Sequence, residues 1–235
     1  MALTFLTFGG PSQNYHSAVN RITNEAKRFE LFDNIVGLTE DYLKNDTVFW
    51  KKHQTFMENN SRGYGYWLWK SYITKKQLEQ MNENDILLYA DAGCTLNIHG
   101  KKRLKEYIQM AKDHNIVSFQ MNHHLEQVWT KMDTILELKA TGLMETGQLI
   151  GGIFLIKKCK ITIDLVNRWY NTCCKYHLLN DNCVLPNHSS FRDNRHDQSI
   201  WSILRKQNCK FFLTDETYTV PWNTDFPIWA TRMRN

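Results

Sequence analysis

Apolar and polar positions along the chain alternate between the spacing of strands and the spacing of helices. Residues 3–8 form a short apolar run that predicts a first strand, and apolar residues then recur at helical spacing over 19–29. A second apolar run begins at Ile35. This order predicts a βαβ unit in which Gly9-Gly10-Pro11-Ser12 makes the turn into the helix.

The alternation continues along the chain. It predicts further elements in the order helix 104–111, strand 116–119, helix 125–136, strand 149–156, helix 163–173, polar loop 180–195 and a last helix opening near His196. Strands that alternate with helices indicate an α/β fold. The length suits one domain over residues 1–235, and we find no repeat or interior linker in the sequence.

Composition refines this picture only slightly. The 235 residues are 42% hydrophobic and 23% charged, as in an ordinary globular protein, and 8 Trp, 10 Tyr and 12 Phe supply many rings for stacking. The formal net charge of +5 permits an anionic partner, but Lys and Arg are dispersed, so nucleic acid is not an expected partner. The six Cys residues form no CxxC pair, which indicates reduced thiols.

The first residues carry no export signal. Residues 1–8 have no positively charged start and reach Gly9 after too few apolar positions for a signal peptide or membrane anchor. We expect no transmembrane segment and a cytoplasmic protein. Peripheral attachment to a membrane and a location in a virus-infected cell are both compatible with this expectation.

The clearest candidate for chemistry lies in Asp85-Ile-Leu-Leu-Tyr-Ala-Asp-Ala-Gly-Cys94. Its apolar residues predict a buried strand over 86–90, so Asp91 falls at the carboxyl end, where open α/β sheets bind ligands. A carboxylate there, followed by Gly93, which lets the backbone approach closely, suits a divalent cation or a diphosphate. The alternative is turn chemistry, because Asp and Gly are common turn residues.

Three further segments concentrate unusual residues. Arg62-Gly-Tyr-Gly-Tyr-Trp-Leu-Trp-Lys70 joins two glycines and four aromatic rings to two cations that suit phosphate; aromatic packing at a helix start is the alternative. Asn194-Arg-His-Asp-Gln198 brings a metal ligand, a base and an amide to a helix start, or else forms an N-cap. Two adjacent glycines in the strand 149–156 indicate a close approach by ligand or backbone.

Known hydrolase and kinase motifs are missing from the sequence: there is no GxSxG elbow and no GxxxxGK[ST] loop. The segments 62–70, 86–94, 151–156 and 195–199, in their order and spacing, resemble those of a family of small bacterial and viral glycosyltransferases with the GT-A fold. The wider group includes the glycogenin and lipopolysaccharide galactosyltransferase enzymes. The resemblance implies a Rossmann-like fold for nucleotide-diphospho-sugar transferases, with a mostly parallel central sheet flanked by helices.

The resemblance also implies roles for single residues. Asp91 matches the first Asp of an Asp-x-Asp motif that holds Mn²⁺ or Mg²⁺, while Gly93 stands where the second Asp would be. The metal ligands would be Asp91 and His196, with Asp197 as an alternative to the histidine. Asp197 and Gln198 match the Asp-Gln pair at the anomeric carbon and are the predicted catalytic residues. The predicted donor-binding residues are Phe8, Gly9 and Tyr15 near the base, Arg62 and Lys70 near the diphosphate, and Asp91, Gly93, Gly151 and Gly152.

These assignments predict a glycosyltransferase of polysaccharide biosynthesis. It would move a sugar from a nucleoside-diphosphate donor to a hydroxyl of a glycan or other acceptor, assisted by a divalent metal. An inactive nucleotide-sugar or carbohydrate-binding protein is the alternative, which Gly93 favours. In the tail, Trp222, Phe226 and Trp229 would stack on an acceptor or cover the sheet, and Arg232 and Arg234 would meet the diphosphate or end in solvent.

Overall fold

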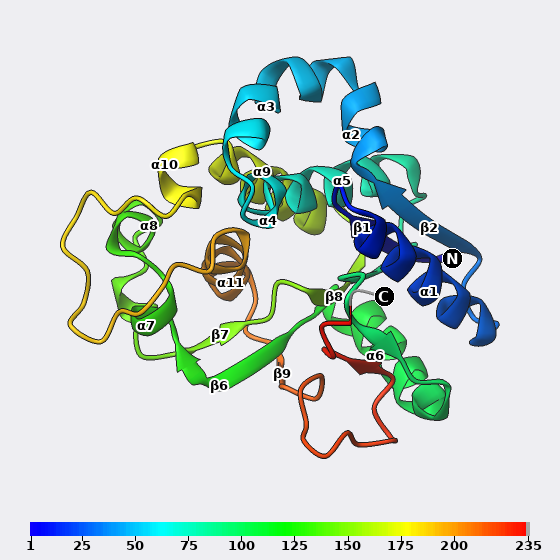
Figure 1. Ribbon diagram of the computed structural model, residues 1–235. Coiled ribbons are helices and arrows are strands. Elements are labelled where there is room, and N and C mark those ends of the chain that lie inside the picture. Colours follow the sequence, from blue (N-terminus) through cyan, green and yellow to red (C-terminus); the bar gives the residue numbers. More distant parts are fainter. Residues whose placement is uncertain (234–235) are drawn as a thin grey trace.

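A five-stranded sheet forms the centre of the computed structural model, which describes residues 1–233 (Figure 1). Its strands lie in the order β2 (Asn34–Thr39), β1 (Leu3–Gly9), β3 (Ile86–Ala90), β8 (Ile153–Lys157) and β5 (Ile116–Val117). The first three are parallel, whereas β8 is antiparallel to both of its neighbours. Four strands therefore run in one direction and the sheet is mixed. Arg234, one of the two tail cations considered above, lies outside the described residues.

Two smaller sheets flank this centre. One has the order β7 (Gly147–Leu149), β6 (Phe119–Leu125), β9 (Leu213–Thr214), and the other pairs β10 (Ile228–Trp229) with β4 (Thr95–Leu96). The predicted strand 149–156 is thus two strands in different sheets, separated by Gly151 and Gly152. The predicted strand 116–119 also divides, between β5 and β6.

Eleven α-helices and two short 3₁₀ turns lie within residues 1–233. The helices are α1 (Gln13–Arg28), α2 (Glu40–Asn45), α3 (Thr47–Asn59), α4 (Gly63–Tyr66), α5 (Leu68–Gln80), α6 (Lys101–His114), α7 (Glu126–Trp129), α8 (Met132–Glu137), α9 (Lys160–Cys173), α10 (Tyr176–Leu179) and α11 (Asp197–Asn208). The 3₁₀ turns are Ile98–Gly100 and Thr141–Leu143. None of these helices combines the length and the apolar composition needed to cross a membrane.

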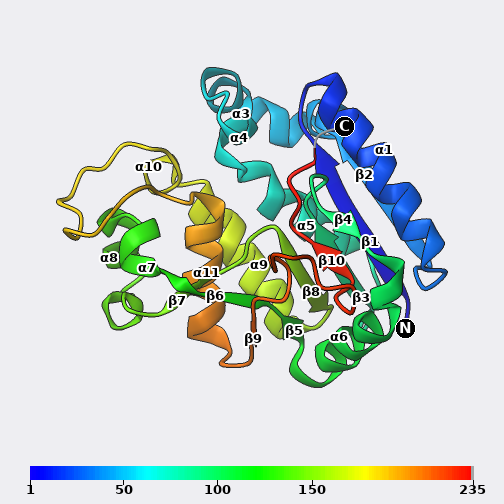
Figure 2. The same cartoon turned by 60° about the horizontal axis from the view of Figure 1, so that its bottom comes forward.

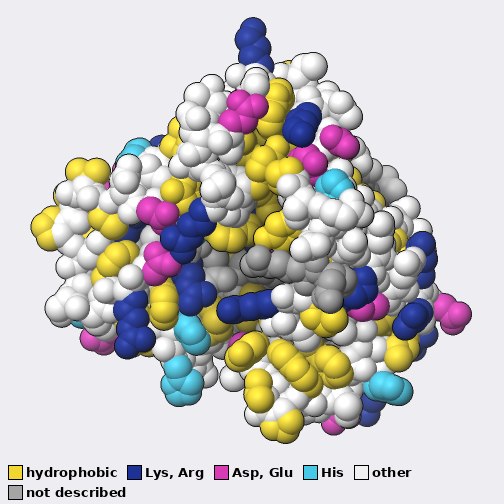
Figure 3. Space-filling model, viewed as in Figure 1, with side chains coloured by type: hydrophobic (Ala, Val, Ile, Leu, Met, Phe, Trp, Pro, Cys, Tyr) yellow, Lys and Arg dark blue, Asp and Glu magenta, His cyan; other side chains and the backbone are white. Residues whose placement is uncertain are grey.

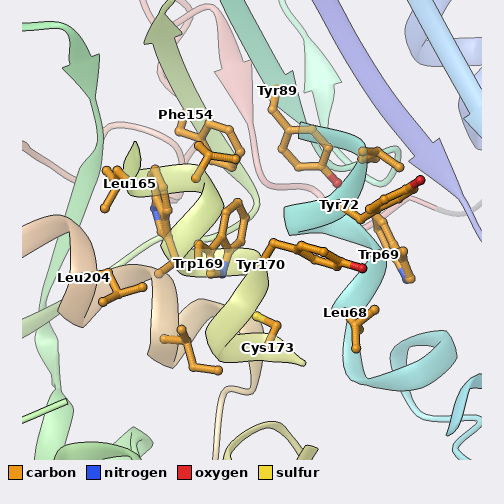
Figure 4. Close-up of a cluster of buried hydrophobic side chains, with 14 of the residues drawn as sticks. Leu68, Trp69, Tyr72, Tyr89, Phe154, Leu165, Trp169, Tyr170, Cys173 and Leu204 are labelled. Atoms are coloured by element: carbon orange, nitrogen blue, oxygen red, sulfur yellow. The ribbon is translucent and has the colours of Figure 1, made fainter. Parts of the chain in front are cut away.

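Helices cover both faces of the central sheet, so its strands are buried on both sides. Side chains of α1 and α6 pack with Ile86 and Leu88 on one face. Those of α5, α9 and α11 pack with Leu87 and Tyr89 on the other, as Figure 4 shows for the cluster around Trp169. Alternation along β3 therefore sends successive side chains into two cores, which explains why this strand is apolar throughout.

The predicted helix 125–136 was wrong as a single element. It forms α7 and α8, which Thr130 and Lys131 separate. Lys131, which looks like a solvated residue in the sequence, is fully buried, and its Nζ donates to the carbonyl oxygens of Asn180 and Asn182 at 2.8 and 2.7 Å. A buried ammonium needs such acceptors, and the break between α7 and α8 falls at this residue.

Candidate functional site

The carboxyl end of β3 places Asp91 at an edge of the central sheet. Its Oδ1 accepts a hydrogen bond from the Tyr89 hydroxyl at 2.7 Å and lies 3.1 Å from Lys70 Nζ. Its backbone N–H donates to the carbonyl oxygen of Gly152 at 2.8 Å. These contacts fix one carboxylate oxygen and leave the side chain partly exposed, with 39% of its surface accessible.

Lys70 joins Asp91 to the start of α11. Its Nζ lies 3.3 Å from Asp197 Oδ2, and Lys70 and Asp197 are each only 3% exposed. The three side chains come from α5, from the end of β3 and from the first turn of α11. A carboxylate in the first turn of a helix is favoured by the helix dipole, so the local sequence supports the position of Asp197.

The pKa of Asp197 is raised to about 7, because the effect of burial, to which Asp91 adds, outweighs the opposing effect of Lys70. Burial would lower the pKa of Lys70, but Asp197 and Asp91 outweigh it and hold that pKa above its usual value. The ammonium is therefore charged at neutral pH, while Asp197 can take up or release a proton there. A carboxyl group with this behaviour is suited to acid–base chemistry.

Gln198 follows Asp197 and is held in one orientation. Its Oε1 accepts from the backbone N–H of Gly151 at 3.0 Å, and its Nε2 donates to Gln148 Oε1 at 2.7 Å. Gln148 is oriented in turn by donating through Nε2 to Thr130 Oγ1 at 3.0 Å and to the buried Glu126 carboxylate at 3.3 Å. The side-chain amide beside Asp197 therefore presents a fixed face.

Gly151 and Gly152 let two segments of chain come together at this edge. A Cβ added at Gly152 would lie 2.6 Å from Asp91 Oδ2, and one added at Gly151 would lie 2.9 Å from Gln198 Cβ. The adjacent glycines are needed because these side chains approach the backbone closely. The structure thus brings Lys70, Asp91, both glycines and the Asp197–Gln198 pair to one place.

Several residues in the segments next to Lys70, Asp197 and Gly93 have a strained backbone conformation. Tyr64, Tyr66, Trp67, His196 and Arg232 all have positive φ angles between 51° and 60°. A positive φ is uncommon for residues other than glycine and costs of order 1–3 kcal/mol where it persists. Positive φ angles also occur at Glu30, Asn84, Asn115 and Lys139, so backbone strain alone does not single out this edge of the sheet.

The residues predicted near the nucleotide base lie at the β1–α1 turn. The Phe8 ring is buried and stacks on Trp69 with centroids 4.0 Å apart, so a ligand reaches Phe8 only through its backbone. A Cβ added at Gly9 would lie 2.7 Å from the carbonyl oxygen of Tyr15, so only glycine lets α1 start this close to β1. Tyr15 stands in the first turn of α1 and is half-buried.

Arg62 and His196 lie away from Asp91. Arg62 donates to Asp181 at 2.9 Å and to Asp193 at 2.6 Å on the surface. His196 Nδ1 lies 2.8 Å from the Leu179 carbonyl oxygen, and its Nε2 faces Asp181 at 3.6 Å. Burial lowers the pKa of His196, while the bond to Leu179 opposes that shift. Both ring nitrogens of His196 thus point toward Leu179 and Asp181, which does not fit the expectation that His196 and Asp91 bind one metal ion.

The side chains at this edge do not form the ligand set of a divalent cation. Gly93 offers no side-chain ligand, and the Lys70 ammonium occupies the space between Asp91 and Asp197. Within residues 1–233, no group of three or more His, Cys, Asp or Glu side chains is arranged to hold a metal ion. Protein sites for Mg²⁺ or Mn²⁺ use oxygen ligands, and of the two carboxylates at this edge only Asp91 is exposed, at 39%, whereas Asp197 is buried.

Known proteins resemble this chain in structure but not in sequence. No protein-family model matches the chain, and no curated protein matches its sequence. Similar solved structures include a glycosyltransferase involved in the glycosylation of the major capsid of PBCV-1, at 10% identity and a TM-score of 0.51, covering 97% of this chain and 92% of that one. Another is mouse xyloside xylosyltransferase 1, at 12% identity and a TM-score of 0.50, covering 94% of this chain and 89% of that one.

The chain has the GT-A glycosyltransferase fold. The predicted fold class is thereby confirmed over nearly the whole chain. In this GT-A fold, the edge that carries Asp91 and Asp197 is the carboxyl edge of the parallel strands β1 and β3, where open α/β sheets bind their ligands.

Sequence reasoning missed two side chains that hold this site together, Tyr89 and Gln148. Tyr89 is read as a core residue because it lies in an apolar strand, and its hydroxyl bond to Asp91 is not visible in that pattern. Gln148 comes directly before the buried strand residue Leu149, a place where a fully buried amide is unusual. A glutamine directly before an apolar strand run was therefore the signal in the sequence that could have pointed to Gln148.

Proposed function

We propose that this protein is a glycosyltransferase that moves a sugar from a nucleoside-diphosphate donor to a hydroxyl of a glycan or other acceptor. The observation that carries the proposal is the meeting of Asp91, Lys70 and Asp197 at the carboxyl edge of the sheet, with Nζ–O distances of 3.1 and 3.3 Å. The GT-A fold supports a sugar-transfer function in general. The motif resemblance of the same residues supports it independently.

The donor would lie across the edge from β1 to α11. Gly9 and Tyr15 at the β1–α1 turn would adjoin the nucleoside, because helix N-termini and free amides receive nucleotides there. Asp91, whose side chain is 39% exposed, would face the ribose. Asp197 and Gln198 would adjoin the sugar, and Gly151 and Gly152 would let it approach the backbone.

Transfer passes through an oxocarbenium-like transition state in which negative charge grows on the departing diphosphate. Cationic groups fixed at that position stabilise the transition state more than the ground state, and one contact contributes about 3 kcal/mol, or about a hundredfold in rate. On the acceptor side, Asp197 would take the proton of the attacking hydroxyl. Its pKa of about 7 suits that role near neutral pH.

A second candidate is a protein that binds nucleotide sugars or carbohydrates without turnover. Gly93, in place of a second carboxylate, is the observation that favours it. A protein that binds nucleotide sugars would hold the donor at Asp91 as the enzyme does, but only the enzyme releases nucleoside diphosphate. Turnover therefore separates them.

The test is a screen of UDP-, GDP- and dTDP-sugars that measures the melting temperature and the release of nucleoside diphosphate. A donor at a hundred times its Kd stabilises by about 3 kcal/mol, which is roughly 5–10 °C for a chain of this size. We expect both effects for one donor class, their loss in Asp91→Asn, and their retention in Asp164→Asn, which removes an exposed carboxylate on α9. Stabilisation without release would favour the binding protein, and no response at all would refute the proposal.

A further inference from the structure

The C-terminal segment fills the space beside Gly93. A Cβ added at Gly93 would lie 3.3 Å from Arg232 Cα and 3.4 Å from the carbonyl oxygen of Met233. The second carboxylate of an Asp-x-Asp motif would start from that Cβ. The backbone of Arg232, a cationic residue, therefore lies in close contact with the position where that side chain would begin.

Several hydrogen bonds hold this segment in place. The backbone N–H of Met233 and the hydroxyl of Thr231 both donate to the carbonyl oxygen of Gly93, at 2.8 and 3.0 Å. The Thr231 and Thr95 hydroxyls are 2.8 Å apart, next to the β4–β10 pairing that Figure 2 shows beside β3. Between these anchors Arg232 has a φ of 60°. The bonds on either side keep it in this strained conformation.

A second cation, Arg195, lies just before α11. It precedes His196 and Asp197, and its guanidinium stacks on the Trp129 ring 4.1 Å from the centroid. Arg232 lies beside Gly93 and Arg195 lies two residues before Asp197, so the two arginines flank the carboxylates that share Lys70. Burial lowers the pKa of Arg195 and the charge of Arg232 lowers it further, whereas Asp193 raises it. Within residues 1–233 neither arginine has a carboxylate within 4 Å. Figure 3 shows Lys and Arg side chains along the middle of this face.

Because Arg232 is exposed and neither guanidinium is held by a carboxylate within residues 1–233, both are available to an anion. Guanidinium groups bind phosphate oxygens with two parallel hydrogen bonds, so a diphosphate is the anion whose chemistry fits. Arg62 differs from this pair, because Asp181 and Asp193 already neutralise it.

We propose that Arg232 and Arg195 bind the donor diphosphate in place of a divalent cation, so that this protein works without metal. The inference rests on the proposed function and deepens it. During transfer the bond between the anomeric carbon and the diphosphate oxygen breaks, and its electron pair stays on that oxygen, where the two guanidinium groups neutralise it. The acceptor oxygen bonds to the anomeric carbon, and its proton passes to Asp197.

The experiment measures the Kd of UDP, GDP and dTDP by calorimetry, once in EDTA and once in MnCl₂. We expect the wild type to bind one of them with the same Kd, within about threefold, in both solutions. Arg232→Gln and Arg195→Gln should each weaken binding by about tenfold or more, because each removes a charge-assisted contact. Arg28→Gln, which removes an exposed charge at the end of α1, should bind as the wild type does. Donor turnover in EDTA is the second readout.

The outcomes separate the two proposals. Binding or turnover that is lost in EDTA and restored by Mn²⁺, with Arg232→Gln equal to the wild type, overturns the metal-free site and leaves the proposed function standing. Equal weakening by all three arginine variants would indicate net charge alone and would also overturn it. Failure of all three nucleotides to bind in either solution refutes the proposed function, and this inference with it.

Discussion

Replacing Gly152 by alanine tests whether Asp91 lies at the reacting centre. The new Cβ would lie 2.6 Å from Asp91 Oδ2 and 3.2 Å from its Cγ, whereas ordinary contact begins at 3.4 Å. The oxygen must therefore retreat by about 0.8 Å. It cannot do so freely, because Oδ1 is bonded to Tyr89 and Lys70 and the Asp91 backbone is bonded to Gly152 itself.

Two magnitudes follow from this displacement. Overpacking of this kind costs about 1–3 kcal/mol, which lowers the melting temperature of a chain of this length by roughly 3–9 °C. Displacing a group that positions the substrate by about 1 Å can cost about a hundredfold in rate. We therefore expect Gly152→Ala to fold, to have a melting temperature a few degrees lower than the wild type, and to turn over donor about a hundredfold more slowly.

Gly142→Ala is the matched control, because a Cβ added at Gly142 meets no atom within 4 Å. The assay follows release of nucleoside diphosphate at saturating donor, together with the melting temperature of each variant. We expect the control to behave as the wild type in both. If folded Gly152→Ala turned over donor at the rate of the control, Asp91 would not be positioned for the reaction and the reasoning would fail.

Three further predictions follow from the buried polar groups. kcat should rise with pH through about 7 as Asp197 ionises and should lose this rise in Asp197→Asn; a flat wild-type profile from pH 6 to 8 would count against its role as a base. The pKa of His53 is lowered to about 4 by burial and by Lys52, so the unfolded chain binds its proton first on acidification. The stability that is complete above pH 6.5 is therefore lost as the pH falls toward 4, by about 2 kcal/mol between pH 8 and 5. Urea unfolding should show this loss in the wild type and not in His53→Gln; equal losses would refute it. Gln148→Met removes the acceptor of Gln198 Nε2 and should lower kcat about tenfold with an unchanged donor KM; a change in KM alone would point to a structural role.

Elements that depend on local pattern were accessible from the sequence. The strands Leu3–Gly9 and Ile86–Ala90 are apolar because helices cover both faces of the sheet, and the helix Lys101–His114 keeps its apolar residues on one side. Asp91 could be selected because a strand end fixes where the next side chain lies. The same local reasoning placed Asp197 at a helix start.

Features that depend on distant contacts were not accessible. The break between α7 and α8 accompanies bonds from Lys131 to Asn180 and Asn182, some 50 residues further on. The position of Arg232 depends on a hydrogen bond from its neighbour Thr231 to Gly93, which is 138 residues away in the chain. Periodicity carries no information about such pairs, so the surroundings of the site required the fold.

The most direct test of the central claim is a crystal structure with the nucleoside diphosphate sugar that stabilises the protein. The account predicts the nucleoside beside Gly9 and Tyr15, its ribose at Asp91, the diphosphate at the guanidinium groups of Arg195 and Arg232, and the sugar against Asp197 and Gln198. A donor bound elsewhere, with the carboxyl edge of β3 empty, would contradict it.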